Sequence, residues 1–333
     1  MKLIRTVLFT LCCCFLNNSN VFALTTTFYI DDLGRSVAVP VHPKRLVSTY
    51  DVDITIPLIE LGILPIGSHG RLNRNGTPYL RSSARLTGVD FDNSSISFIG
   101  ATKLDLEKIV SLKPDLIITE KNRSTPIELL ARIAPTVVID SSKGAPQVYR
   151  KLAKLTASQV QLGRLERRYA MQIAALKNSI GSATITASVF QSLRGKLSVY
   201  HSYRALGQVL RDAGFHFPEL INAIDPGQRI SLSVERLPEL DADIIFSPYR
   251  ADQAGGAATE IAHMNTMLAN FCNFLQACRS GNYVLVPRDL AISNSYAGLQ
   301  AMATMVQAHL IARPKQNSLP DEPIKPADSA FIP

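Results

Sequence analysis

The residues best suited to chemistry in this chain are arginines that lie in loops. The stretch RLNRNGTPYLRSSAR, residues 71–85, contains four of them and follows an apolar segment. A guanidinium group stays charged and offers a fork of donors that matches carboxylate oxygens. Four later loops, EKNRS, QSLRGK, SPYRAD and VPRD, also carry arginine. The arginines that we expect to contact a ligand are Arg71, Arg74, Arg123, Arg194, Arg250 and Arg288.

Other residues near the same loops are expected to play smaller parts. Arg81 and Arg85 lie further along the first loop, and we expect them to be solvated. Lys121 adds positive charge to the second loop. Tyrosines supply hydroxyl donors and flat packing surfaces near these positions. The tyrosines in question are Tyr50, Tyr200, Tyr249 and Tyr296.

The elements that position these loops alternate between helix and strand. Residues 105–120 and 125–140 each show an amphipathic helix, a proline break and a buried strand. The same order returns in residues 231–249, whereas residues 146–180 show only helical spacing of apolar side chains. Short buried strands that alternate with helices predict parallel sheets, and ligands bind beyond the carboxyl ends of such strands.

The predicted fold class is therefore α/β, with two Rossmann-like lobes that are built on small parallel sheets and joined by a long rigid α-helix. We expect a first lobe over residues 24–145 and a second lobe over residues 181–312. Residues 146–180 form the interlobe segment, as one helix or two nearly continuous ones. A cleft between the lobes is the natural ligand site.

The two ends of the chain are expected to lie outside this fold. Residues 1–23 combine a basic start, an apolar segment and the sequence VFA, which is typical of a cleavable Sec signal peptide. No small residue precedes a cysteine as a lipoprotein requires, so we expect an exported, soluble protein that is not a lipoprotein. Residues 313–333 contain five prolines without periodicity, which predicts a disordered tail.

Composition supports a folded, exported and basic protein. The 333 residues are 46% hydrophobic and 19% charged, which excludes an intrinsically disordered chain. The formal net charge is +8, and loss of Lys2 and Arg5 with the signal peptide leaves 33 basic and 27 acidic residues, or +6.

Cys272 and Cys278 are the two cysteines that remain after the signal peptide is removed. An oxidising compartment favours a disulfide between them. An unbroken helix would hold their Cα atoms about 9 Å apart, which is too far to bridge. A disulfide therefore requires the helix to end between them, and the alternative is two buried free thiols.

Several stretches resemble the helical-backbone (cluster A-II, class III) periplasmic substrate-binding proteins of ABC importers, which capture ferric siderophores, haem or cobalamin. The most specific one is GATKLDLEKIVSLKPDLIITEKN, residues 100–122, and LGQVLRDAGFHFP and SLSVERLPELDADIIF match the second lobe. The loops look most similar to those of ferric-dicitrate-type binding proteins. The resemblance covers nearly all of the mature chain and implies two lobes that close by only a few degrees around a stiff helix.

The resemblance also implies residue roles. One glutamate on each lobe would dock on the permease, and by motif these are Glu107 and Glu235. Tyr296, in SYAG, falls where a related protein places an aromatic ligand contact. The ligand implied by the arginines is an anionic ferric siderophore of carboxylate or citrate type, delivered to an inner-membrane ABC permease by a monomer. No catalysis, cofactor or resident metal ion is expected.

Four other functions remain to be weighed. Haem is the second candidate ligand, with His69, His201 and Tyr200 as possible axial ligands. Zinc or manganese uptake would need His and acidic ligands together, and the histidines are not placed for it. No GxSxG, HExxH or phosphate-loop motif points to an enzyme. Nucleic acid is excluded because the arginines are not interleaved with aromatics and the protein is exported.

Overall fold

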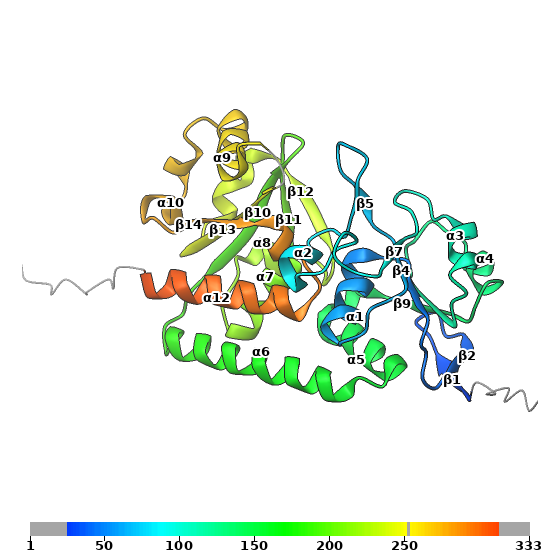
Figure 1. The fold of residues 1–333 in the computed structure, drawn as a ribbon. Helices are drawn as coiled ribbons and strands as arrows, with labels where there is room; N and C mark the ends of the chain where they lie inside the picture. Colours follow the sequence, from blue (N-terminus) through cyan, green and yellow to red (C-terminus); the bar gives the residue numbers. More distant parts are fainter. Residues whose placement is uncertain (1–24, 252–253, 313–333) are drawn as a thin grey trace, which may run out of the picture.

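The computed structural model describes residues 25–251 and 254–312, so the expected signal peptide and C-terminal tail lie outside the described residues. Two α/β lobes stand side by side above a pair of long helices (Figure 1). This arrangement confirms the predicted fold class. Between the ends of the described chain, no helix is long and apolar enough to cross a membrane.

The first lobe is built on a five-stranded sheet in the order β7-β4-β3-β8-β9, in which all neighbouring strands are parallel. Two antiparallel hairpins, β1-β2 and β5-β6, flank it. The strands are β1 Thr26–Ile30, β2 Ser36–Pro40, β3 Leu46–Ser48, β4 Gly67–Ser68, β5 Arg71–Leu72, β6 Pro78–Tyr79, β7 Ser97–Phe98, β8 Leu116–Glu120 and β9 Thr136–Ile139. The helices are η1 Asp51–Thr55, α1 Ile56–Glu60, α2 Ser83–Thr87, α3 Leu106–Ser111, α4 Ile127–Ala131 and η2 Ser141–Lys143.

The second lobe has a five-stranded sheet in the order β12-β11-β10-β13-β14. Only the β10-β13 and β13-β14 pairs are parallel, because β10, β11 and β12 form an antiparallel meander. The strands are β10 Ala187–Leu193, β11 Lys196–Tyr200, β12 Arg229–Leu232, β13 Ile244–Tyr249 and β14 Tyr283–Pro287. The helices are α7 Arg204–Ala213, α8 Glu219–Asn222, η3 Val234–Leu240, α9 Gly256–Met267, η4 Phe271–Phe274, α10 Gln276–Arg279, α11 Arg288–Ala291 and α12 Tyr296–Ala312.

Two helices connect the lobes, α5 (Ala145–Thr156) and α6 (Gln159–Ile180). Ala157, at φ 52°, ends the first helix in a left-handed conformation, and the second begins two residues later. Helix α6 packs against α12, and the two helices run side by side in Figure 1. The connection is thus the two nearly continuous helices allowed by the sequence pattern.

One hydrophobic core runs through both lobes and the helices between them. It joins Leu116 and Val137 of the first sheet, Leu162 and Leu176 of α6, and Phe246 of the second sheet in one buried cluster. Burial of this much apolar surface in one contiguous cluster couples the lobes mechanically. The two lobes therefore share buried apolar contacts in addition to the helices that connect them.

Cys272 and Cys278 form a disulfide, with a Cα–Cα distance of 5.2 Å. Helix η4 ends at Phe274 and α10 begins at Gln276, with Leu275 in an extended conformation between them. The break in the helix is what brings the two cysteines within bonding distance.

Candidate ligand-binding cleft

A pocket of about 310 Å³ lies between the two lobes, and guanidinium groups line it from both sides. Arg71 and Arg81 come from the first lobe, and Arg250 and Arg288 come from the second. Tyr79, Ser82, Ala251 and Asp289 complete the lining. Four arginines that converge on one small space form a site for an anion with several acceptor oxygens.

Strand ends place these arginines. Arg71 begins β5 opposite Tyr79 on β6, so the hairpin holds it at the mouth of the cleft. Gly70, just before it, has no room for a side chain, because an added Cβ would lie 2.5 Å from the ring of Phe91. Arg250 follows β13 and Arg288 follows β14, which are adjacent parallel strands. Both therefore emerge at the same carboxyl-terminal edge of the sheet.

A buried carboxylate fixes the direction of Arg71. Asp51 is fully buried, and its Oδ2 accepts from Nε of Arg71 at 3.2 Å and from the backbone N–H of Arg81 at 3.3 Å. Its Oδ1 lies 3.3 Å from Nδ1 of the buried His69. Burial alone would raise the pKa of the Asp51 carboxyl, but His69 and Arg71 outweigh it and lower the pKa. Asp51 thus holds the guanidinium group of Arg71 in position at the cleft.

Arg81 has a different environment. Within the described residues, no carboxylate lies at ion-pair distance from its guanidinium group. Burial lowers the pKa of Arg81, and the charges of Arg71 and Arg288 lower it further. A cation held among like charges is unfavourable in the empty protein and becomes favourable when an anion enters. The expectation that Arg81 is simply solvated is therefore wrong.

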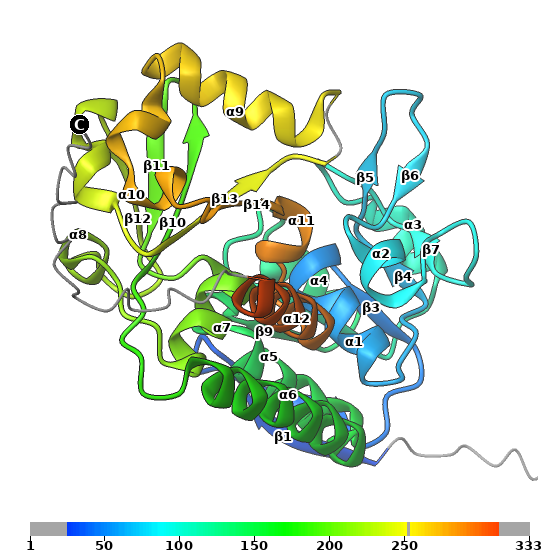
Figure 2. The same cartoon turned by 90° about the vertical axis from the view of Figure 1, so that its left-hand side faces the viewer.

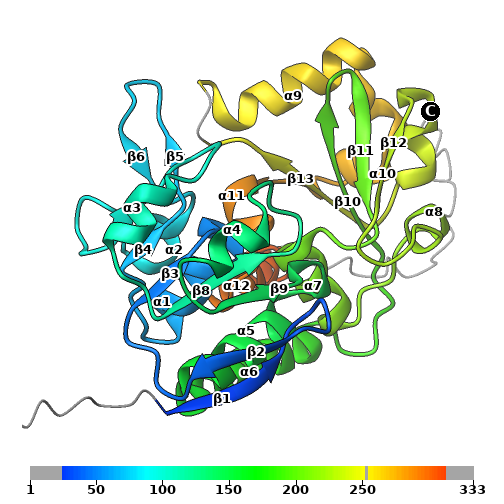
Figure 3. The same ribbon diagram turned by 90° about the vertical axis from the view of Figure 1, so that its right-hand side faces the viewer.

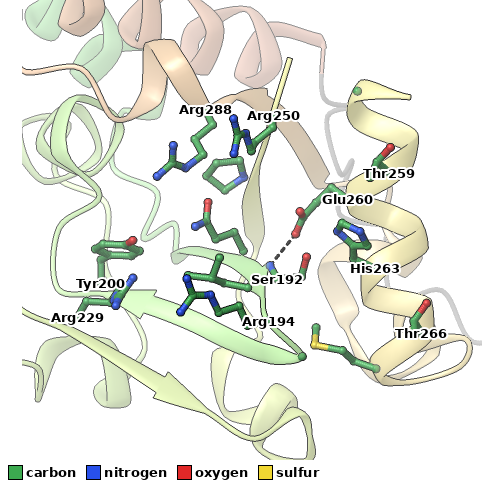
Figure 4. A pocket seen from close by; sticks show the side chains of 16 residues that line it. Ser192, Arg194, Tyr200, Arg229, Arg250, Thr259, Glu260, His263, Thr266 and Arg288 are labelled. Carbon is green, nitrogen blue, oxygen red and sulfur yellow. Dashed lines mark hydrogen bonds between the residues drawn. The ribbon is translucent and has the colours of Figure 1, made fainter. Parts of the chain in front are cut away.

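A second pocket of about 430 Å³ adjoins the first and belongs to the second lobe (Figure 4). Arg250 and Arg288 line both pockets. Arg194 and Arg229 line the second pocket from the β10-β11-β12 meander, with Tyr200 beside them. Arg194 (φ 53°) and Gly195 (φ 71°) form the turn between β10 and β11, and two positive φ angles are typical of a tight hairpin. The cationic surface thus continues from the interlobe space onto the second lobe.

The opposite wall of this second pocket is helix α9. Glu260 of α9 accepts a hydrogen bond from the backbone N–H of Ser192 at 2.7 Å, and His263 lies one turn further along (Figure 4). Burial raises the pKa of the Glu260 carboxyl. Four arginines therefore face one enclosed acid and one histidine, so the wall reduces the positive charge of the pocket without cancelling it.

Two ion pairs connect the lobes beside the pockets. Nη1 of Arg204 lies 2.8 Å from Oδ1 of the buried Asp53, and Nη1 of Arg85 lies 3.1 Å from Oδ1 of Asp289. Burial alone would lower the pKa of Arg204, but the Asp53 carboxylate raises it overall. Asp289 therefore pairs with Arg85 of the other lobe, and its neighbour Arg288 lines both pockets.

The remaining sequence candidates lie outside the two pockets. Arg74 is exposed in the β5-β6 turn, and Arg123 stacks on the ring of Tyr50, with its Cζ 4.8 Å from the ring centroid. Tyr249 is partly buried at the end of β13, where Gly256 approaches its ring.

Tyr296 needs a correction. It is 2% exposed and packs edge-on against Tyr149, with ring centroids 4.8 Å apart. It belongs to the interlobe core because it begins α12, which packs on α6, and so it offers a ligand no surface.

One of the three haem-ligand candidates, His69, is committed to other contacts. His69 is 1% exposed, and its Nε2 lies 2.7 Å from the carbonyl oxygen of Ala101 while Nδ1 faces Asp51. Neither ring nitrogen is open to an iron atom. Tyr200 lines the second pocket, and His201 follows it outside both pockets. Among the described residues, no group of three or more His, Cys, Asp or Glu side chains could hold a metal ion.

The two glutamates assigned to permease docking are both exposed. Glu107 lies in the first turn of α3, where Asp105 caps the helix by accepting from the backbone N–H of Lys108 at 2.9 Å. Glu235 lies in the first turn of η3. Each carboxylate is therefore near a helix N-terminus, where the helix dipole favours negative charge.

The sequence analysis missed Arg81 and Arg229 as cleft residues. Arg229 lies on β12, and that strand pairs with the unforeseen strand β11. A signal for β11 exists in KLSVY, residues 196–200, in which side chains alternate after the turn Arg194–Gly195. Nothing comparable marks Arg81, because its position depends on how the β5-β6 hairpin folds back.

The chain is similar to known proteins in sequence and in fold. The model of the periplasmic binding protein family matches residues 82–266. A Bacillus subtilis protein named "Probable siderophore-binding lipoprotein YfiY" is 30% identical over 251 residues, covering 72% of this chain and 74% of that protein. The iron(3+)-hydroxamate-binding protein FhuD of Bacillus subtilis is 28% identical over 247 residues, covering 70% and 73%. The structure of Staphylococcus aureus SirA complexed with staphyloferrin B has a TM-score of 0.69 at 22% identity, covering 86% of this chain and 98% of that one, and so shares the fold.

Proposed function

The chain belongs to the periplasmic binding protein family, which consists of substrate-binding proteins and not enzymes, and from this premise we propose that it is a receptor for an anionic ferric siderophore. The chelate is of carboxylate or citrate type and binds in the cleft between the lobes. The protein then delivers it to an inner-membrane ABC permease for iron uptake.

The observation that carries this proposal is the convergence of arginines from both lobes. Arg71, Arg81, Arg250 and Arg288 line one pocket, and the last two continue into the next. The ligand would bind through bidentate guanidinium–carboxylate pairs. The hydrogen bonds in such pairs join two charged groups and are therefore strong, especially in an enclosed site. The relatives named for siderophore and iron(3+)-hydroxamate binding support an iron chelate as the ligand class. The charge of the cleft supports an anionic chelate over a neutral hydroxamate.

The other parts of the proposal concern location and partners. The protein is exported through a cleavable signal peptide, acts as a monomer without a cofactor, and is not a lipoprotein. Glu107 and Glu235 dock on basic residues of the permease subunits, one from each lobe. Both are exposed carboxylates in the first turn of a helix, as such a contact requires.

Haem is the weaker candidate for this cleft. A haem carrier would present an axial His or Tyr beside a broad apolar wall. His69 is buried and faces Asp51 and a backbone carbonyl, and the pockets are lined by cations. The haem propionates would find arginines here, but His69 offers the iron no open ring nitrogen, His201 lies outside both pockets, and Tyr200 is the one candidate that lines a pocket.

Tyrosine fluorescence tests the ligand class, because the chain has ten Tyr and no Trp. The protein is titrated with ferric citrate, a neutral ferric trihydroxamate and haemin. Ferric citrate should bind at least tenfold more tightly than the neutral chelate, a difference of about 1.4 kcal/mol. Its affinity should also fall with added salt. Tighter binding of the neutral chelate would overturn the carboxylate class, and tightest binding of haemin would favour the alternative.

A further inference from the structure

Most of the excess positive charge of this protein lies away from the cleft, on the two interlobe helices. Residues 145–180 contain seven Lys or Arg against one acidic residue, Glu166, an excess of +6 in a chain whose formal net charge is +8. Helix α6 runs along the edge of the molecule opposite the β5-β6 hairpin and α9, as Figures 1, 2 and 3 agree. The ligand proposed above does not account for this charge.

The outer side of α6 carries a regular stripe. Val160, Arg164, Arg167 and Met171 follow one another at spacings of four, three and four residues, which aligns them along one line of the helix. Val160 is 74% exposed and Met171 is 67% exposed, although both are large apolar residues. Arginines thus lie between two exposed apolar side chains on the same line.

The basic side chains of this stripe are available to a partner. Arg150 lies 3.5 Å from Glu166 in an exposed ion pair, so the one acid of the two helices is already engaged. In residues 25–251 and 254–312, Arg164, Arg167, Arg168 and Lys177 have no carboxylate at ion-pair distance. We call Arg164, Arg167 and Arg168, together with Val160 and Met171, the α6 face; Lys177 lies on the opposite flank of the helix from Arg168.

The hairpin β1-β2 lies beside α5, the helix that precedes α6. Nζ of Lys154 on α5 lies 5.6 Å from the ring centroid of Tyr29, so β1 packs directly beside the helix pair. Phe28 and Ile30, the neighbours of Tyr29 on β1, are 78% and 63% exposed. Because successive side chains of a strand point to opposite faces, Phe28 and Ile30 point away from α5, and the exposed apolar residues of the α6 face are Val160 and Met171.

We propose that the α6 face docks on an anionic phospholipid surface. An interfacial helix binds such a surface through basic residues on its polar side and through apolar side chains that enter the headgroup boundary. The α6 face is a convex helix surface with dispersed apolar contacts, which fits an extended charged surface better than the pocket-and-anchor contacts of a protein interface. Adsorption through this face would leave the cleft, on the opposite edge, open to solvent.

Co-sedimentation with lipid vesicles tests the proposal on the mature protein. One set of vesicles contains phosphatidylglycerol and phosphatidylcholine, and the other contains phosphatidylcholine alone. The test variant combines Arg164→Gln, Arg167→Gln and Arg168→Gln. Its charge-matched control combines Lys103→Gln, Lys108→Gln and Lys196→Gln, three exposed lysines on other elements. Circular dichroism and thermal unfolding verify that both variants are folded.

The wild-type protein should bind the anionic vesicles and not the neutral ones. Each basic residue near an anionic surface contributes roughly fivefold in affinity, so the α6 variant should lose about a hundredfold. The control variant should lose less than about threefold, and Met171→Asp alone should weaken binding several-fold by removing the apolar contact. Equal losses in the two triple variants would show a net-charge effect and overturn the proposal. Absence of wild-type binding to anionic vesicles would overturn it as well, and would leave the cleft proposal untouched.

Discussion

The cleft and the α6 face are both rich in arginine, yet the two regions hold these side chains in opposite ways. In the cleft, Arg71, Arg81 and Arg288 come from separate elements and converge, and burial together with the charges of the other two lowers the pKa of Arg81. On α6, Arg164, Arg167 and Arg168 come from one helix and spread into solvent. Arginines that converge repel one another in the ligand-free protein, and a bound anion relieves this repulsion. Arginines that spread into solvent along a helix do not repel one another in this way. Arrangement therefore decides function more than the number of arginines does.

The largest expected effect is on stability, and it concerns the carboxylate that pairs with an arginine in each region. Asp51→Asn removes a fully buried acid that holds Arg71 and faces His69, so we expect about 3 kcal/mol lower stability by denaturant unfolding. Glu166→Gln removes the exposed partner of Arg150 and should cost less than about 1 kcal/mol. Similar costs for the two variants would contradict the idea that the cleft rests on a buried charge.

Asp51 also predicts a pH dependence. Its folded-state pKa is lowered, so its contribution to stability is present above the unfolded-state pKa and is lost as the pH falls through the folded-state value. Wild-type unfolding free energy should therefore drop on acidification below about pH 4 more steeply than that of Asp51→Asn. Parallel pH profiles for the two proteins would contradict this assignment.

The next effect concerns Arg288, one of the two arginines that line both pockets. Arg288→Ala should weaken ferric citrate binding by at least tenfold, since a hydrogen bond to a charged group contributes about 1.5–3 kcal/mol. Arg168→Ala on α6 is the matched change and should leave that affinity within about twofold. Fluorescence titration measures both, and equal losses would mean that general charge attracts the chelate.

A smaller effect of opposite sign is expected for Arg81. Removing a cation from among like charges should stabilise the empty protein, so Arg81→Gln should raise its unfolding free energy by roughly 0.5–1 kcal/mol. The same variant should bind ferric citrate more weakly. Arg167→Gln should change neither property, because its side chain is solvated. An Arg81 variant that is less stable than the wild type would contradict the repulsion argument.

The smallest effect is expected at the tip of the β5-β6 hairpin. Arg74 is exposed there and lies outside both pockets, so Arg74→Ala should change ferric citrate affinity by about twofold or less. A loss of tenfold or more would show that the hairpin closes over the ligand and would move Arg74 from the solvated set to the cleft set.

The sequence predicted the layout of this protein because layout depends on local periodicity. Local sequence patterns indicate the helical spacing in residues 146–180 and the buried strands Leu116–Glu120 and Ile244–Tyr249. A local pattern also indicates the end of a helix between Cys272 and Cys278. Strand β11 was missed although its alternation is visible, because the turn before it contains one glycine and no proline or asparagine. Its antiparallel pairing with β10 makes the second sheet mixed.

The sequence predicted those site residues that lie at the ends of strands. Arg71, Arg250 and Arg288 follow or begin strands and line the interlobe pocket as expected from position alone. Arg81 and Tyr296 could not be placed in this way. The position of Arg81 depends on how the β5-β6 hairpin folds back onto the first lobe. The position of Tyr296 depends on the packing of α12 against α6. Side-chain direction in irregular segments is set by long-range packing, which a single sequence does not display.

The central claim, that convergence of arginines in the cleft binds the chelate, is tested most directly by two variants of equal charge. One combines Arg71→Gln, Arg81→Gln and Arg288→Gln in the cleft, and the other combines Arg164→Gln, Arg167→Gln and Arg168→Gln on α6. Both are titrated with ferric citrate by tyrosine fluorescence at one ionic strength. We predict that the cleft variant loses affinity by about a hundredfold or more while the α6 variant stays within about twofold of the wild type. Equal affinities of the two variants would contradict the account.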